Sequence, residues 1–220
     1  MKLGIELFVI LNSFKLSMMG FKIQALILFT TLSFLAHGQA GTIKIINNIS
    51  DALFENRIIY QTKVGLDSSI TYMLIDYVGL SDQRYKGLII KDSTQVLLEW
   101  IEINNDTLQD LDPIDLKRKE WIRTCNQHNA EELVRNFYAS DALYYNHKPL
   151  IQGTDAIIAE YSYMNNPNYS LNLVPLIVEA VNHNVVFEIG RCEGSYHGKY
   201  ILIWEKNKND SWLVKFDANL

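Results

Sequence analysis

Residues Tyr196–Glu205 have the sequence YHGKYILIWE, and after a short polar turn Trp212–Asp217 continue as WLVKFD. Successive side chains of a strand point to opposite faces. One face of the first segment therefore carries Tyr200, Leu202 and Trp204, and the other carries Ile201, Ile203 and Glu205. A sheet that is apolar on both faces needs cover on both. We expect helices to cover one face and a second subunit to cover the other.

The rest of the C-terminal half supplies the other strands and the helices. Four extended segments close the chain: Ser170–Val181, Val185–Arg191, Tyr196–Glu205 and Trp212–Asp217. Upstream, apolar residues follow helical spacing from Ile114 to Phe137, and polar Asn126–Asn129 predict a break into two helices. A further short helix is expected from Thr154 to Met164, after a strand at Asp141–His147. This order predicts an α+β fold with helices packed against an antiparallel sheet.

The region before these helices has a different character. Residues 41–112 contain short segments rich in β-branched and aromatic residues, such as Ser69–Val78 and Gln95–Ile103, separated by polar turns. They predict a small β-rich region whose fold we do not recognise. Asn104–Pro113 is polar and acidic and ends in proline, as a linker does. We therefore expect three parts: residues 1–40, 41–112 and 113–220.

Five pieces of the last part together resemble a known superfamily. They are Trp121, Ala130–Tyr138 (AEELVRNFY) leading into Ala139–Ala142, Pro149–Ile157 (PLIQGTDAI), Gly198–Trp204 and Trp212–Asp217. In this order they resemble the nuclear-transport-factor-2-like (NTF2-like) superfamily, specifically its SnoaL-like members, over about half of the chain. The resemblance implies a curved sheet wrapped around helices as a cone open at one end, and a homodimer formed through the outer face of the sheet.

The resemblance does not choose one function, because this fold hosts enzymes and binding modules alike. Three functions stay open. The first is an exported module that binds a small apolar molecule. The second is a cofactor-free isomerase, cyclase or dehydratase, and the third is a dimerisation or scaffold domain without a ligand.

An enzyme of this kind needs a general base, and the resemblance directs attention to two residues. Asp141 lies where a helix is expected to meet a strand; the alternative is a turn or capping residue. His147 ends a predicted strand; the alternative is a solvated loop histidine. Asp217 is a third candidate. It is opposite in parity to Trp212, Val214 and Phe216 on the last predicted strand, so it points into the cone only if those three do not face the packed core.

Aromatic residues offer a pocket with polar tips. The pocket candidates are Phe137, Tyr138, Tyr144, Tyr145, Tyr161, Trp204 and Asp217, with Tyr163 and Tyr169 close by in the sequence. The alternative is an ordinary hydrophobic core. The helix segment also carries Lys117, Arg118, Lys119 and Arg123, which we interpret as a solvated face rather than an anion site.

Charge and motifs exclude several classes of partner. The formal charge is −5, and leaving out residues 1–40, with Lys2, Lys15, Lys22 and Glu6, makes it −7. An acidic surface repels nucleic acid and anionic lipid. The histidines show no metal-binding spacing and no phosphate or dinucleotide motif occurs, so we expect no metal and no cofactor. Cys125 and Cys192 either pair or stay buried as thiols.

The first forty residues have the features of an export signal. Lys22 precedes the apolar stretch Ile23–Ala36, and small residues follow it. We expect translation to start at Met18 or Met19 and cleavage to leave a mature chain that begins between His37 and Gly41. The protein would then be periplasmic or secreted, with no stable membrane association. The alternative is an uncleaved membrane anchor.

Overall fold

The computed structural model describes residues 43–46, 53–64, 69–105, 110–146 and 149–220. Residues Ala40–Leu220 form one compact unit. Within the described ranges, this unit contains a five-stranded sheet, which we call the N-terminal sheet, and a six-stranded sheet, which we call the C-terminal sheet. Helices lie between them in the chain, so the fold is α+β, as the sequence predicts.

The N-terminal sheet accounts for the β-rich region. Its strands are β1 (Ile43–Ile46), β2 (Leu53–Lys63), β3 (Thr71–Gly79), β4 (Arg84–Lys91) and β5 (Val96–Ile103). Strands β2 to β5 form an antiparallel meander, and β1 pairs with β5 in parallel. The sheet is therefore mixed.

After β5, the described part of the chain contains three α-helices and one 3-10 helix. They are α1 (Asp112–Cys125), α2 (Ala130–Phe137), α3 (Thr154–Glu160) and the 3-10 helix η2 (Tyr161–Asn165). Pro113 stands in the first turn of α1, where a missing N–H is tolerated. The side chain of Asn129 accepts a hydrogen bond from the Glu132 N–H and caps α2. The break between α1 and α2 falls at the polar residues that predict it.

The C-terminal sheet is mixed rather than purely antiparallel. Its strands are β6 (Tyr138–Tyr145), β7 (Ile151–Gln152), β8 (Leu171–Asn182), β9 (Val185–Gly194), β10 (Lys199–Lys206) and β11 (Trp212–Asn219), in the order β7-β6-β11-β10-β9-β8. The last strand inserts beside β6 and runs parallel to it. The expectation of an antiparallel sheet fails at this pair, because chain order does not reveal which strands become neighbours.

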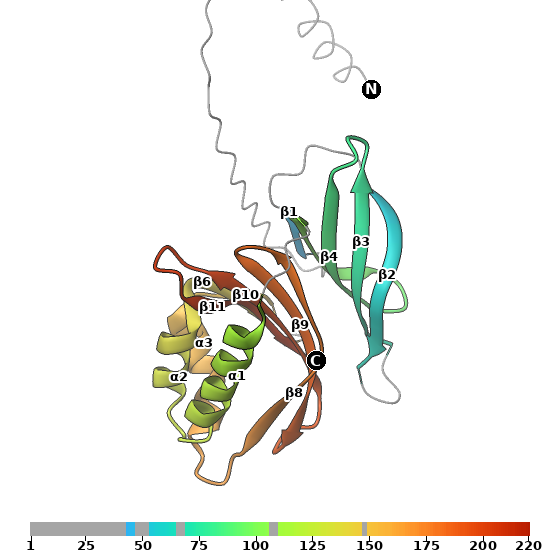
Figure 1. Ribbon diagram of the computed structural model, residues 1–220. Helices are drawn as coiled ribbons and strands as arrows, with labels where there is room; N and C mark the ends of the chain where they lie inside the picture. Colours follow the sequence, from blue (N-terminus) through green and yellow to red (C-terminus); the bar gives the residue numbers. More distant parts are fainter. Residues whose placement is uncertain (1–42, 47–52, 65–68, 106–109, 147–148) are drawn as a thin grey trace, which may run out of the picture. The chain divides into compact units, whose positions relative to one another are not determined.

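The two faces of the C-terminal sheet contact different layers. The helices gather on one face, which we call the inner face (Figure 1). There Tyr200, Leu202 and Trp204 pack with α1 and α2 residues such as Trp121 and Leu133. Ile201 and Ile203 point to the opposite, outer face. The alternation of β10 is therefore the one that its sequence predicts.

The N-terminal sheet packs against the outer face. Leu88, Leu98 and Trp100 share a buried cluster with Phe187 and Ile203. The Trp100 and Phe216 rings lie 5.8 Å apart, and Lys86 Nζ on β4 bonds Glu179 Oε2 on β8 at 2.8 Å. The second apolar face is thus covered from within the same chain. The sequence leads to the expectation of a second subunit at this face. In the structure, the N-terminal sheet of the same chain covers it instead.

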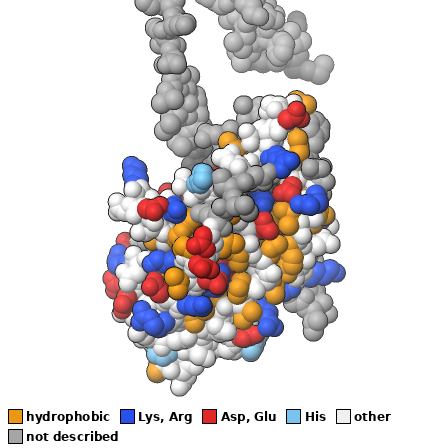
Figure 2. Space-filling model, viewed as in Figure 1, with side chains coloured by type: hydrophobic (Ala, Val, Ile, Leu, Met, Phe, Trp, Pro, Cys, Tyr) orange, Lys and Arg blue, Asp and Glu red, His pale blue; other side chains and the backbone are white. Residues whose placement is uncertain are grey.

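Acidic and basic side chains are interspersed on the described surface visible in Figure 2. That face shows no continuous basic field of the kind that nucleic acid binding uses. None of the helices in the described ranges is long and apolar enough to cross a membrane.

Candidate functional site

A β-bulge decides where Asp217 points. On β11, Val214 pairs with Trp204 and Phe216 pairs with Ile203, which leaves Lys215 as an extra residue. An extra residue reverses the alternation of every side chain after it. Trp212 and Val214 therefore face the helices, Phe216 faces the N-terminal sheet, and Asp217 returns to the inner face.

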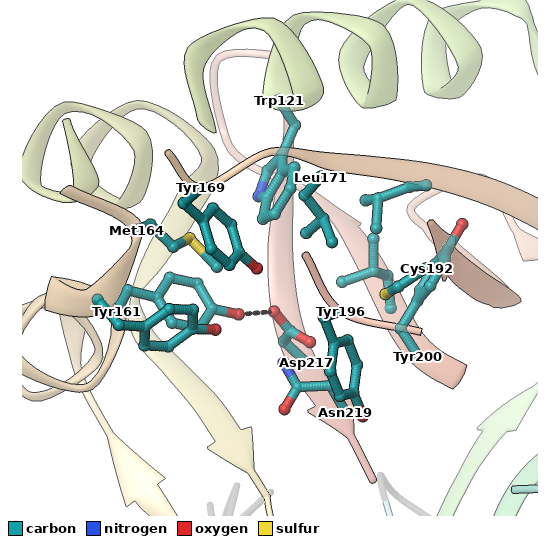
Figure 3. Close-up of a pocket in the computed structure, with 13 residues that line it drawn as sticks. Trp121, Tyr161, Met164, Tyr169, Leu171, Cys192, Tyr196, Tyr200, Asp217 and Asn219 are labelled. Carbon is teal, nitrogen blue, oxygen red and sulfur yellow. Dashed lines mark hydrogen bonds between the residues drawn. The ribbon is translucent and has the colours of Figure 1, made fainter. Parts of the chain in front are cut away.

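Two tyrosine hydroxyls hold Asp217 there. Tyr138, at the start of β6, donates to Asp217 Oδ2 at 2.6 Å. Tyr161, at the start of η2, donates to the same oxygen. The two phenol oxygens lie 3.1 Å apart. The other carboxyl oxygen points away from Tyr161 in Figure 3.

Burial changes the proton affinity of this cluster. Asp217 is 3% exposed, and burial raises its pKa from 3.8 to about 6, although the hydrogen bonds from Tyr138 and Tyr161 act to lower it. Burial, followed by the charge of Asp217, also raises the pKa of both phenols. The cluster therefore contains one carboxyl that titrates near neutral pH and two phenols that stay protonated as donors.

Asp217 borders a small cavity whose lining includes six aromatic rings (Figure 3). The lining residues are Trp121, Tyr161, Tyr163, Met164, Tyr169, Leu171, Leu173, Cys192, Tyr196, Tyr200, Leu202, Asp217 and Asn219. Its volume is about 20 Å³, room for about one water molecule. Tyr163 is 46% exposed, and Tyr169 and Tyr196 are half-buried, so these rings separate the cavity from solvent.

Trp121, one of the lining residues, is buried, and its indole Nε1 makes no hydrogen bond in the described part of the chain. It lies near the Tyr138 hydroxyl and acts to lower the pKa of that phenol, but without the geometry of a hydrogen bond. A buried unpaired N–H is unfavourable unless a ligand or water accepts from it.

A second buried carboxylate lies on the same sheet face and is fully paired. Glu188 on β9 receives Arg118 Nε at 2.6 Å and Arg118 Nη2 at 3.0 Å. Tyr200 and Trp204 add donors at 2.7 and 2.9 Å. Arg118 is thus buried against the sheet. The interpretation of the basic helix segment as a solvated face is wrong for this residue.

Of the two bases proposed from the sequence, the structure describes only Asp141, which lies away from the cavity. The Asp141 side chain is 60% exposed, and Lys215 Nζ donates to its Oδ2 at 2.6 Å. It is on β6, away from the residues that line the cavity, and it caps no helix. His147 falls outside the described residues. Asp217 is the carboxyl that the structure brings to the cavity.

The predicted pocket residues divide into three groups. Tyr161 and Asp217 line the cavity, as do Tyr163 and Tyr169. Tyr138 and Tyr144 lie outside the lining and contact it by hydrogen bonds. Tyr138 donates to Asp217 Oδ2, and Tyr144 donates to Asn219 Oδ1 at 2.7 Å. Phe137 and Trp204 are core residues, and Tyr145 belongs to the outer face.

Residues far apart in the sequence complete the lining, and no local pattern in the sequence marks them as pocket residues. Trp121 comes from α1, and Cys192 and Tyr196 come from β9 and the segment after it. Tyr196 lies over Gly198, where an added Cβ would fall within 1.9 Å of its hydroxyl. Gly190 lies against the Tyr200 ring and Gly198 against Tyr196, so these two glycines are the local signal in the sequence for a close approach of rings.

The cysteines are unpaired, and the described residues offer no cluster of metal ligands. Cys125 and Cys192 are free buried thiols, and burial raises the pKa of each to about 12. The described residues include no group of three or more His, Cys, Asp or Glu side chains arranged to hold a metal ion.

Known structures resemble about half of the chain. An NTF2-like protein of unknown function from Shewanella oneidensis is 17% identical, with a TM-score of 0.44, over 49% of this chain and 96% of that one. A ketosteroid isomerase-like protein from Erwinia carotovora (12%, TM-score 0.43) matches over 51% of this chain and 96% of its own. A putative scytalone dehydratase from Novosphingobium aromaticivorans (13%, TM-score 0.43) covers 50% and 81%.

The solved structures similar to this chain thus include NTF2-like and ketosteroid isomerase-like proteins, over about half of the chain. No family model matches the sequence, and no curated protein matches it.

Proposed function

We propose that the space between the helices and the inner face of the C-terminal sheet binds one small, largely apolar molecule through a single polar group. The observation that carries this proposal is Asp217, a buried carboxyl held by two tyrosines at the edge of a cavity lined with aromatic rings. Ligand sites commonly combine an apolar lining with a few converging polar groups.

The cavity has to open for such a ligand, because its volume of about 20 Å³ is far below the roughly 300 Å³ of a typical small-molecule site. The rings at the solvent side supply the freedom to do so. Tyr163 is partly exposed, and Tyr196 lies in the segment between β9 and β10, outside regular structure. Ligand entry is therefore expected to displace these two rings.

Amide chemical shifts measured during a titration with 2-naphthol test the proposal. This neutral probe has an aromatic body and one hydroxyl. We expect shifts at η2, β9 and β11 around the cavity, and weaker binding by Asp217→Asn than by the control Asp141→Asn. Absence of shifts around the cavity at millimolar probe would contradict binding and favour a scaffold domain without a ligand.

Proton transfer is the second candidate function, and the pKa of about 6 at Asp217 favours it. A carboxyl whose pKa lies near the working pH can accept a proton and return it. Asp217 would take the role that the sequence assigned to Asp141 or His147, with no cofactor needed. If a substrate is found, turnover by Asp217→Asn should fall at least about 100-fold, and the wild-type rate should rise with pH through about 6.

Export is proposed on the sequence of residues 1–40 alone, which lie outside the described residues. N-terminal sequencing of the exported protein should find a first residue between His37 and Gly41. A membrane fraction that retains residues upstream of Phe21 would favour the uncleaved anchor instead.

A further inference from the structure

The two buried carboxylates of the inner face differ in their charge balance. Glu188 is matched by the Arg118 guanidinium, which contacts both of its oxygens. Among the described residues, Asp217 has hydrogen bonds from Tyr138 and Tyr161 but no ion pair. Phenol hydroxyls stabilise a carboxylate without cancelling its charge. A buried charge without a countercharge is unfavourable. A cation bound beside Asp217 would therefore stabilise its ionised carboxylate.

The walls of the cavity suit the same kind of ligand. Six of its lining residues are aromatic: Trp121, Tyr161, Tyr163, Tyr169, Tyr196 and Tyr200. Consecutive rings meet edge to face, with Tyr161 and Tyr163 at 6.2 Å and Tyr163 and Tyr169 at 5.3 Å between centroids. The faces of aromatic rings attract organic cations, and this attraction strengthens when water is excluded.

The charges of the lining also discriminate among ligands. Asp217 is acidic, and no lysine, arginine or histidine is among the residues that line the cavity in the described part of the chain. An anionic ligand would therefore meet a like charge in a buried site. A neutral ligand would leave the carboxylate without a countercharge. A cation satisfies both the carboxylate and the rings.

We propose that the ligand of this cavity is a small organic ammonium ion, with its charge at Asp217 and its alkyl groups against the aromatic rings. The inference deepens the proposed function and rests on it. Such an ion supplies the countercharge that the carboxylate lacks and the organic cation that the ring faces attract.

Choline and 3,3-dimethyl-1-butanol form a matched pair of probes. They share the hydroxyl and the shape of the branched head, and they differ in the charge of that head. Both are titrated into the wild-type chain and followed by amide chemical shifts. At pH 8, where Asp217 is ionised, we expect choline to bind at least tenfold more tightly than the neutral alcohol, with shifts around the cavity.

Two variants locate the effect. Asp217→Asn keeps the shape of the side chain and removes its charge, so the preference for choline should disappear. Asp141→Asn, at the exposed ion pair with Lys215, should keep the full preference. Each variant is first checked by its amide spectrum, so that a loss of binding is not confused with unfolding.

The outcomes separate this inference from the proposed function. Equal or weaker binding of choline relative to the neutral alcohol or 2-naphthol would overturn the ammonium ligand and leave small-molecule binding intact. A choline preference that survives in Asp217→Asn would also overturn it. Failure of all three probes to shift residues around the cavity would overturn the proposed function, and the ammonium ligand with it.

Discussion

At the residue scale, Asp217 is held in an environment that opposes its charge. Burial raises its pKa from 3.8 to about 6, a change that corresponds to about 3 kcal/mol between the two protonation states. Because the folded chain holds this proton more tightly than the unfolded chain, Asp217 makes folding less favourable as the pH rises from about 4 to 6. Above that range the full destabilisation is present.

We predict that Asp217→Asn is more stable than the wild type at pH 8, by up to about 3 kcal/mol, and that the difference disappears near pH 4. The titratable groups around Asp217 are neutral across this range, being phenols and a thiol: Tyr72, Tyr138, Tyr144, Tyr161, Tyr163, Tyr196 and Cys192. Urea unfolding at the two pH values measures the effect. Asp141→Asn is the control, and a variant less stable than the wild type at pH 8 would contradict the argument.

The second residue-scale prediction concerns Arg118. Arg118→Met should lower the free energy of unfolding by about 3–5 kcal/mol, because it leaves the Glu188 carboxylate buried without its countercharge. The exposed neighbour Lys119→Met is the matched control and should change stability by about 0.5 kcal/mol or less. Chemical denaturation compares the two. Equal effects of both variants would show that Glu188 does not need Arg118.

Individual residues also show where prediction from sequence ends. The inner face of β10 follows directly from alternation, and Tyr161, a pocket candidate from the sequence, lies in the lining of the cavity. Asp217 could be nominated but not oriented, because the extra residue Lys215 changes which face it occupies. Arg118 looked solvated because its partner, Glu188, is 70 residues away in the sequence. Contacts of this range depend on tertiary packing, which local patterns do not encode.

At the element scale, the strands and helices appear close to where the sequence places them, and the errors concern pairing. The break between α1 and α2 and the last four strands agree with periodicity and turn residues. The parallel pairing of β6 with β11 and the packing of two sheets were not predicted. Both join segments far apart in the chain. Apolar residues on both faces of β10 predict that both faces of the sheet are covered. They do not indicate that the N-terminal sheet covers the outer face.

The N-terminal sheet covers the apolar outer face of the C-terminal sheet. This cover changes what we expect of residues 113–220 when they are produced without the N-terminal sheet. The sequence leads to the expectation that this part folds by itself, since it has its own helices and sheet. In the structure, however, Phe187, Ile201 and Ile203 are buried against the N-terminal sheet. We predict that a chain beginning at Asp112 exposes this face and binds a hydrophobic dye or self-associates.

Dye fluorescence and light scattering test that prediction, with a chain beginning at Gly41 as the control. The longer chain should bind little dye and melt cooperatively. A chain from Asp112 that stays monomeric, binds no dye and melts cooperatively would show that the C-terminal sheet tolerates an uncovered outer face, and that the domain division expected from the sequence is sufficient.

At the scale of the whole molecule, the inner face of the C-terminal sheet carries the polar groups that can contact a ligand, and its outer face holds the two sheets together. The inner face carries two buried carboxylates and the cavity. Toward the outer face, the interface of the two sheets is apolar, with the Lys86–Glu179 ion pair between them. The family resemblance implies a dimer through the outer face. Such a dimer would require the N-terminal sheet to dissociate from that face.

We therefore predict that the chain from Gly41 is a monomer in solution, because the apolar outer face of its C-terminal sheet is already buried by its own N-terminal sheet. Size-exclusion chromatography with light scattering should give the mass of one chain. Trp100→Glu places a charge against Phe216 in the sheet interface and should weaken the packing, so that this variant exposes the outer face and associates. Lys44→Glu, at an exposed side chain of β1, is the control and should remain monomeric. A wild-type dimer that persists unchanged in Trp100→Glu would show that two chains meet through another surface.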